Sequence, residues 1–133
     1  MSLPHLIFGI IVFIVFLVTG KFMRVDFPDK DVIPQDFRLL MRSRHIYILL
    51  SGLLHILLGL YLRIQPQVWR KSLQIIGSVL LFAGTVALVW AFAYETYTAK
   101  TFSEASRSGL YITLAGTIFH VLGGFRLKSK NDE

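Results

Sequence analysis

Four long stretches of the chain contain no charged residue, and this feature constrains the fold more than any other. They run over residues 3–20, 46–62, 72–94 and 108–125. A helix needs about 17–25 residues to cross the hydrocarbon core of a bilayer, because each residue adds about 1.5 Å. None of the stretches has the polar outer face of a helix that packs in a water-soluble protein. The pattern predicts four transmembrane helices, over about 3–23, 46–63, 72–94 and 108–126.

The composition agrees with membrane residence. The 133 residues are 54% hydrophobic and 17% charged, whereas a soluble domain carries about 45–50% apolar and about 25% charged residues. No basic residue precedes the first stretch, so we expect a retained helix there and not a cleaved signal peptide. The lack of cysteine excludes disulfides, thiolate metal sites and thiol catalysis. We therefore expect one all-α integral membrane domain over 1–133, an up-down four-helix bundle.

The connections between the stretches indicate how the helices are arranged. The loop 63–71 is short, so the second and third spans should be antiparallel neighbours. The longer connection contains Pro34 followed by Asp36, which is typical of a helix start. Segment 35–44 has an apolar face and the cationic residues Arg38, Arg42 and Arg44. It predicts either an amphipathic helix at the lipid headgroups or an ordinary extension of the second span with a solvated face.

The charge distribution bears on location and sidedness. The net charge of +6 is explained by basic residues next to the membrane, which anionic lipid attracts, so we expect no nucleic-acid partner. Lysine and arginine slightly favour the side of the first and third loops, which would leave both termini outside the cytoplasm. The small size favours a bacterial plasma (inner) membrane. Glu95 and Arg107 flank the third loop, and as an exposed ion pair they would contribute little to stability.

Small residues recur at intervals of seven in three of the spans. The glycines concerned are Gly52 and Gly59 in the second span, Gly77 and Gly84 in the third, and Gly109, Gly116 and Gly123 in the fourth. A strict seven-residue period marks one stripe of a helix that supercoils left-handedly with its neighbours. Small residues allow close approach of backbones in lipid, where no hydrophobic force drives helices together. The pattern predicts left-handed packing with glycine seams.

Two histidines lie well inside predicted spans. His55 and His120 each have a glycine of the stripe three or four residues away on both sides, which turns them toward the bundle. The second and fourth spans run in the same direction, so the two rings should lie at similar depth. His5 and His45 lie at or near span ends, and we expect His45 to meet headgroups or water. An ionisable residue inside a membrane is a candidate functional residue, because its burial is costly.

Several roles for His55 and His120 remain open at this stage. As a structural pair they would bond to each other, to a backbone carbonyl, or to Ser51, Thr113 or Thr117. As axial ligands they would hold a b-type haem, with the glycines making room for the macrocycle. A quinone or proton site is the third alternative.

We expect a non-catalytic structural, interaction or accessory subunit, because packing residues are abundant and polar chemistry inside the spans is scarce. Its partners would be the bilayer and either further copies of the chain or a larger membrane complex. We expect no catalytic residue, no metal site and no cofactor. If His55 and His120 are instead axial ligands, the cofactor would be haem b. A small-molecule channel along the glycine seams is a further alternative.

Overall fold

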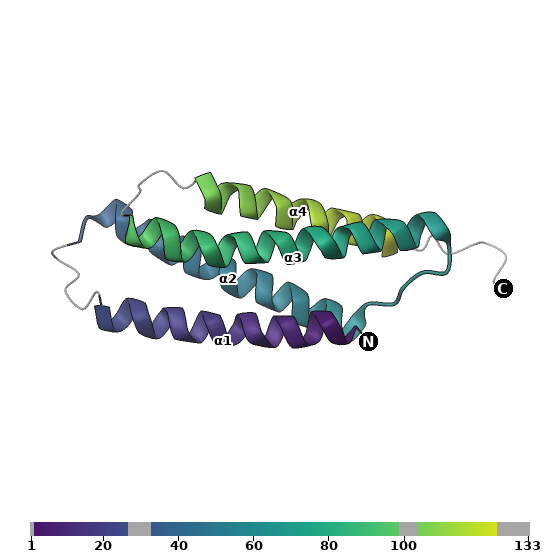
Figure 1. Cartoon of the computed structure of the whole chain (residues 1–133), viewed down its shortest axis with the longest axis horizontal. Helices are drawn as coiled ribbons and strands as arrows, with labels where there is room; N and C mark the ends of the chain where they lie inside the picture. Colours follow the sequence, from purple (N-terminus) through teal and green to yellow (C-terminus); the bar gives the residue numbers. More distant parts are fainter. Residues whose placement is uncertain (1, 27–32, 99–103, 125–133) are drawn as a thin grey trace.

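The computed structural model is all-helical, and it describes residues 2–26, 33–98 and 104–124. Its four helices are α1 (Leu3–Asp26), α2 (Gln35–Tyr61), α3 (Val68–Tyr97) and α4 (Glu104–Gly124). They form an elongated bundle in which successive helices run in opposite directions (Figure 1). The start of α1, the connection from α2 to α3 and the end of α4 lie at the same end of the bundle.

Three helical segments of the described chain are long and apolar enough to cross a membrane: Leu3–Val25, Gln35–Tyr61 and Val68–Thr96. The shorter α4, with Glu104 and Arg107 in its first turns, is not among them. The predicted fourth span therefore corresponds to a helix whose membrane crossing stays a prediction. Segment 35–44 is continuous with the second span, because α2 starts directly after Pro34 and runs without a break to Tyr61.

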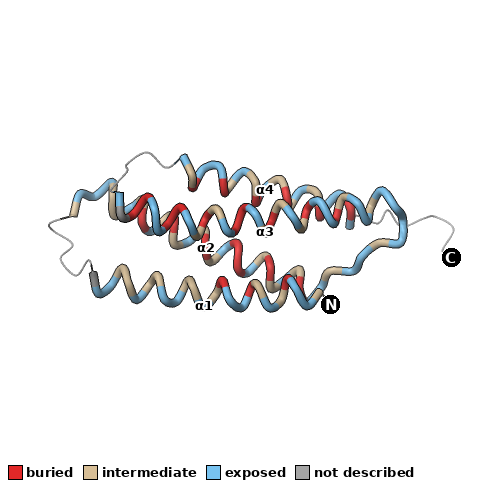
Figure 2. Tube along the Cα trace, in the orientation of Figure 1, coloured by how far each residue is buried: buried red, intermediate tan, exposed pale blue. Residues whose placement is uncertain are grey.

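The helices associate mainly as two hairpins. α1 packs along α2 and α3 packs along α4, whereas α2 and α3 share a smaller contact and α2 hardly touches α4. In Figure 2 most of the buried residues lie on α2, α3 and α4, and α1 is largely exposed or half-buried, with a few buried residues in its first half. The two hairpins therefore share little direct contact between their helices.

The distribution of side chains is inverted relative to a water-soluble protein. Large apolar side chains are exposed on every helix, among them Ile7, Ile14, Leu57, Val79, Val86, Leu114 and Ile118. The interior contains a small apolar cluster of Val12, Ile48 and Phe92, and beside it a series of polar side chains. These buried polar residues include His5, Arg44, His55, Gln74, Thr85, Glu95 and His120. An apolar exterior of this kind is well solvated by lipid and poorly solvated by water.

One glycine seam lies between α1 and α2. A Cβ added at Gly59 would lie 2.6 Å from the Leu6 Cα, and one added at Gly52 would lie 3.1 Å from the Val12 side chain. Gly9, on α1, faces the backbone nitrogen of Ile56 in the same way, at 2.7 Å. The glycines of α2 therefore face α1. Gly9 lies outside the seven-residue pattern, so the sequence did not single it out.

A second glycine seam lies between α3 and α4. Gly77 and Gly116 face each other, each with its virtual Cβ within 3 Å of the other's carbonyl oxygen. Gly84 faces Thr113, Gly109 faces Leu88, and Gly123 faces Gln74 and the Arg70 carbonyl. The glycines of α3 and α4 thus lie in one seam, separate from the seam that contains Gly52 and Gly59.

Candidate functional site

His55 lies at the centre of a polar network that joins the two hairpins. Its ring is completely buried. Its Nδ1 lies 2.8 Å from the Nδ1 of His5 on α1, and its Nε2 lies 3.2 Å from the Thr85 hydroxyl on α3. Both nitrogens of the ring therefore have partners within the protein, and these partners come from two other helices.

Ser78 on α3 links His5 to His120. The Ser78 hydroxyl oxygen lies 2.9 Å from the His5 Nε2 and 3.1 Å from the His120 Nε2. The same hydroxyl donates its hydrogen to the Gln74 carbonyl, at 2.9 Å. The structure thus brings His55 and His120 into one network, but through His5 and Ser78 and not by direct contact.

The hydrogen bond from Ser78 to the Gln74 carbonyl constrains the tautomers of His5 and His120 when these rings are neutral. A hydroxyl has one hydrogen and two lone pairs. Because Ser78 gives its hydrogen to Gln74, both His5 and His120 must donate to it from Nε2. The Nδ1 of His5 then carries a lone pair, and it lies 2.8 Å from the Nδ1 of His55. The Nδ1 of His120 is left as an acceptor.

Aromatic rings enclose the histidines on the sides that make no hydrogen bonds. Phe82 stacks on His5 with centroids 4.8 Å apart, and it lies 4.7 Å from His55. Phe8 meets His55 edge-on at 4.8 Å. These rings exclude water from the network, which strengthens hydrogen bonds that are satisfied and penalises any that are lost.

The packing of α1 on α2 brings His5 to this network. Leu6 fits against Gly59, and the Ser2 amide donates to the Gly59 carbonyl at 2.7 Å. Sequence reasoning placed His5 at a span end and missed its role. One signal was present, since His5, Gly9 and Val12 follow the i, i+4, i+7 spacing of a single helix face.

The hydroxyl partners expected for the histidines differ from those observed. Ser51, Thr113 and Thr117 each donate to a carbonyl of their own helix, three or four residues earlier. Ser78 and Thr85 take their place. The reason is rotation: the α3 face that meets His5 and His55 carries these hydroxyls, and sequence spacing does not report which helices face each other.

His45 also differs from expectation. Its Nδ1 lies 3.0 Å from the Thr19 hydroxyl on α1, and its ring stacks on Phe16 with centroids 4.1 Å apart. The ring is half-buried between α1 and α2. Because antiparallel packing places the end of α1 beside the start of α2, His45 contacts protein where we expected headgroups or water.

A buried ion pair stabilises the opposite end of the bundle. The Arg44 Nε lies 2.9 Å from a Glu95 carboxylate oxygen, and the two side chains are 1% and 3% exposed. The carboxylate also accepts from the Ser106 hydroxyl at 2.6 Å and from the Ala105 amide at 3.0 Å, in the first turn of α4. This pair joins α2, α3 and α4. We expected Arg44 at the headgroups or on a solvated face, and Glu95 in an exposed pair, so the contact was not predicted from the sequence.

No group of three or more His, Asp or Glu side chains is arranged to hold a metal ion within the described residues 2–26, 33–98 and 104–124. Comparisons with protein-family models, with curated proteins and with solved structures find no match for the chain.

Proposed function

We propose that the chain is a small polytopic membrane protein that acts as a non-catalytic packing or accessory subunit of a membrane assembly. In this proposal all four helices cross the bilayer, including α4, and both termini lie on the same side. The observation that carries the proposal is the engagement of both ring nitrogens of His55 by His5 and Thr85. A histidine whose two ring nitrogens both contact other helices is suited to holding helices together.

The exterior supports a role in assembly. Large apolar side chains are exposed on every helix, and α1 packs mainly on α2 alone. Such surfaces are available to lipid, to a second copy of the chain or to helices of a larger complex. We expect the buried polar groups to contribute specificity, because a change of register between the two hairpins would break the contacts of His5 and His55 with α3.

The same contacts weigh against the haem alternative. An axial ligand needs a nitrogen lone pair directed at the iron. The Nε2 of His55 lies 3.2 Å from the Thr85 hydroxyl, and its Nδ1 lies 2.8 Å from the His5 Nδ1. Ligation of a haem iron by the Nε2 of His55 would require the contact with Thr85 to break, so the contacts favour the structural role.

The proposal predicts that His55→Leu destabilises the bundle and disturbs assembly. The substitution leaves the His5 Nδ1 and the Thr85 hydroxyl without partners in a dry interior, which should cost about 2 kcal/mol or more. His55→Asn is the matched control, because its amide can still donate to His5, and it should lose about half as much. Unfolding in mixed detergent micelles measures the stability.

Assembly is measured in the same preparations, as the mass of the particle in mild detergent or native nanodiscs. We expect the wild-type chain in a species of defined stoichiometry larger than one copy, and a smaller species for His55→Leu. A wild-type chain that is monomeric in native nanodiscs, or a His55→Leu variant with wild-type unfolding, would contradict the proposed role.

A further inference from the structure

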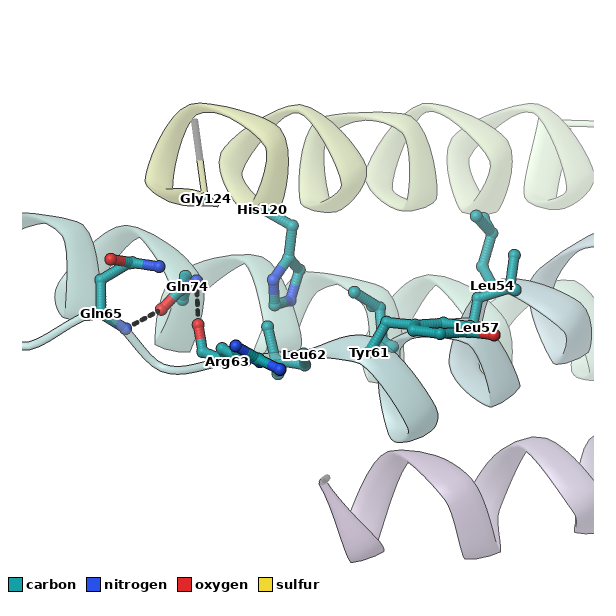
Figure 3. A pocket seen from close by; sticks show the side chains of 10 residues that line it. Leu54, Leu57, Tyr61, Leu62, Arg63, Gln65, Gln74, His120 and Gly124 are labelled. Carbon is teal, nitrogen blue, oxygen red and sulfur yellow. Dashed lines mark hydrogen bonds between the residues drawn. The ribbon is translucent and has the colours of Figure 1, made fainter. Parts of the chain in front are cut away.

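A pocket of about 360 Å³ lies between the ends of α2 and α4, beside the histidine network (Figure 3). Leucines of α2 form its apolar wall, and the loop after α2 contributes polar groups. The lining residues used below are Leu54, Leu57, Arg63, Gln74, His120 and Gly124. Its volume lies in the range of about 300–1,000 Å³ that is usual for small-molecule sites.

Gln74 forms part of the wall without offering a free polar group. Its amide oxygen accepts from the Gln65 backbone N–H at 3.0 Å, and its amide nitrogen donates to the Arg63 carbonyl at 3.1 Å (Figure 3). These two bonds hold the loop against α3. They fix the shape of the pocket before any ligand enters.

His120 contributes a ring nitrogen to this region. Its ring projects from α4 toward the end of α2, and the residue is only 7% exposed. Its Nε2–H donates to Ser78, so the Nδ1 of the neutral ring carries a lone pair. Within the described residues this buried Nδ1 has no hydrogen-bond partner. Buried polar atoms are nearly always hydrogen-bonded. The Nδ1 of His120 therefore calls for a hydrogen-bond donor that the described residues do not supply.

The other residues that line the pocket indicate which chemical groups a ligand would carry. The α2 leucines suit an apolar tail. Arg63 is exposed at the polar end, and no salt bridge is found for it within the described residues. Its cationic head suits an anionic group.

We propose that this pocket binds a lipophilic molecule whose polar head donates a hydroxyl hydrogen bond to the Nδ1 of His120. Two sources share this chemistry in membranes: a quinol, and a phospholipid with a glycerol headgroup. They differ in their use of Arg63, because only the phospholipid brings a phosphate. This site goes beyond the packing role proposed above, and its occupancy can be tested independently of that role.

Native mass spectrometry of the full chain in detergent can test the site with two matched pairs of probes. One pair is a decyl-tailed benzoquinol, kept reduced under nitrogen, and the corresponding quinone, which has no hydroxyl. The other pair is phosphatidylglycerol and phosphatidylcholine, whose headgroup has no hydrogen-bond donor. In at least one pair we expect the hydroxyl-bearing member to bind about tenfold more tightly, the usual weight of one buried hydrogen bond.

Substitutions at His120 separate ligand binding from folding. His120→Gln keeps a donor for Ser78 but removes the acceptor at the Nδ1 position, so we expect about tenfold weaker binding and wild-type unfolding. His120→Asn keeps a polar atom at the Nδ1 position and loses the Ser78 bond. We expect this variant to unfold earlier while it retains binding.

Two further variants define the place and the source of the ligand. A Cβ at Gly124 would meet no described atom within 4 Å, so Gly124→Leu should fill the pocket without disturbing the fold and abolish binding. Arg63→Gln should weaken phosphatidylglycerol about threefold and leave the quinol unchanged.

Preferential binding of either hydroxyl-bearing probe that is lost in His120→Gln and Gly124→Leu supports the proposal. Equal binding within both pairs would overturn it, because the hydroxyl would then make no difference. Binding that survives in Gly124→Leu would overturn it as well, because the probe would then occupy another surface. Loss of the packing role in the His55 experiment would leave these outcomes unchanged.

Discussion

Glu95→Leu is expected to lower the free energy of unfolding by about 3–5 kcal/mol, because it leaves a buried arginine without its carboxylate. Arg44 is 1% exposed, and Glu95 connects it to the Ser106 hydroxyl and the Ala105 amide on α4. The loss should therefore combine an uncompensated charge with unpaired donors at the start of α4. Denaturation in mixed micelles, followed by circular dichroism, measures it.

A double variant separates the charge from the packing. Arg44→Met combined with Glu95→Leu removes both charges, and apolar replacement of a buried ion pair is often neutral. We expect this double variant to recover most of the stability lost in Glu95→Leu. Glu104→Leu, at the exposed start of α4, is the control and should change stability little. If Glu95→Leu unfolds like Glu104→Leu, the buried pair does not hold the helices together.

Gly84→Leu is expected to separate α3 from α4 at a cost of about 3 kcal/mol, the upper end for overpacking of a tight interface. A Cβ at Gly84 would collide with the Thr113 hydroxyl and lie 2.8 Å from the Thr113 backbone nitrogen. Backbone cannot move aside as a flexible side chain can, so the helices must shift. Thermal unfolding in detergent, together with particle mass, measures the effect.

Gly116→Leu should behave like Gly84→Leu, because its Cβ would lie 2.9 Å from the Gly77 carbonyl and from the Leu81 backbone nitrogen. Gly124→Leu provides the matched control on the same hairpin, since a Cβ there meets no described atom within 4 Å. We expect this control to unfold like the wild type. Retention of wild-type stability by both Gly84→Leu and Gly116→Leu would refute the close-packed seam.

The helices were predictable because apolar runs of spanning length have few alternatives. The third run was expected over 72–94 and the fourth over 108–126, and they correspond to Val68–Tyr97 and Glu104–Gly124. The second helix was less predictable. It begins at Gln35, because the charged segment after Pro34 is part of the same helix. Met41 and Arg44 of this segment are buried.

The contacts of the candidate site could not be predicted in the same way. The spacing of His55 and His120 indicated the face on which each lies, but their partners depend on the rotation and axial register of other helices. His5 joins the network because Leu6 fits against Gly59, which is a match between two helices. Arg44 and Glu95 lie far apart in sequence, and neither has a local pattern that identifies the other.

The central claim is that lipid solvates the outside of a bundle whose polar groups lie within. Extraction of isolated membranes with alkaline carbonate tests it most directly, since this treatment releases proteins held by polar contacts and leaves integral ones. We predict that the chain stays in the membrane pellet and enters solution only with detergent. Recovery of folded chain in the detergent-free carbonate supernatant would contradict the account.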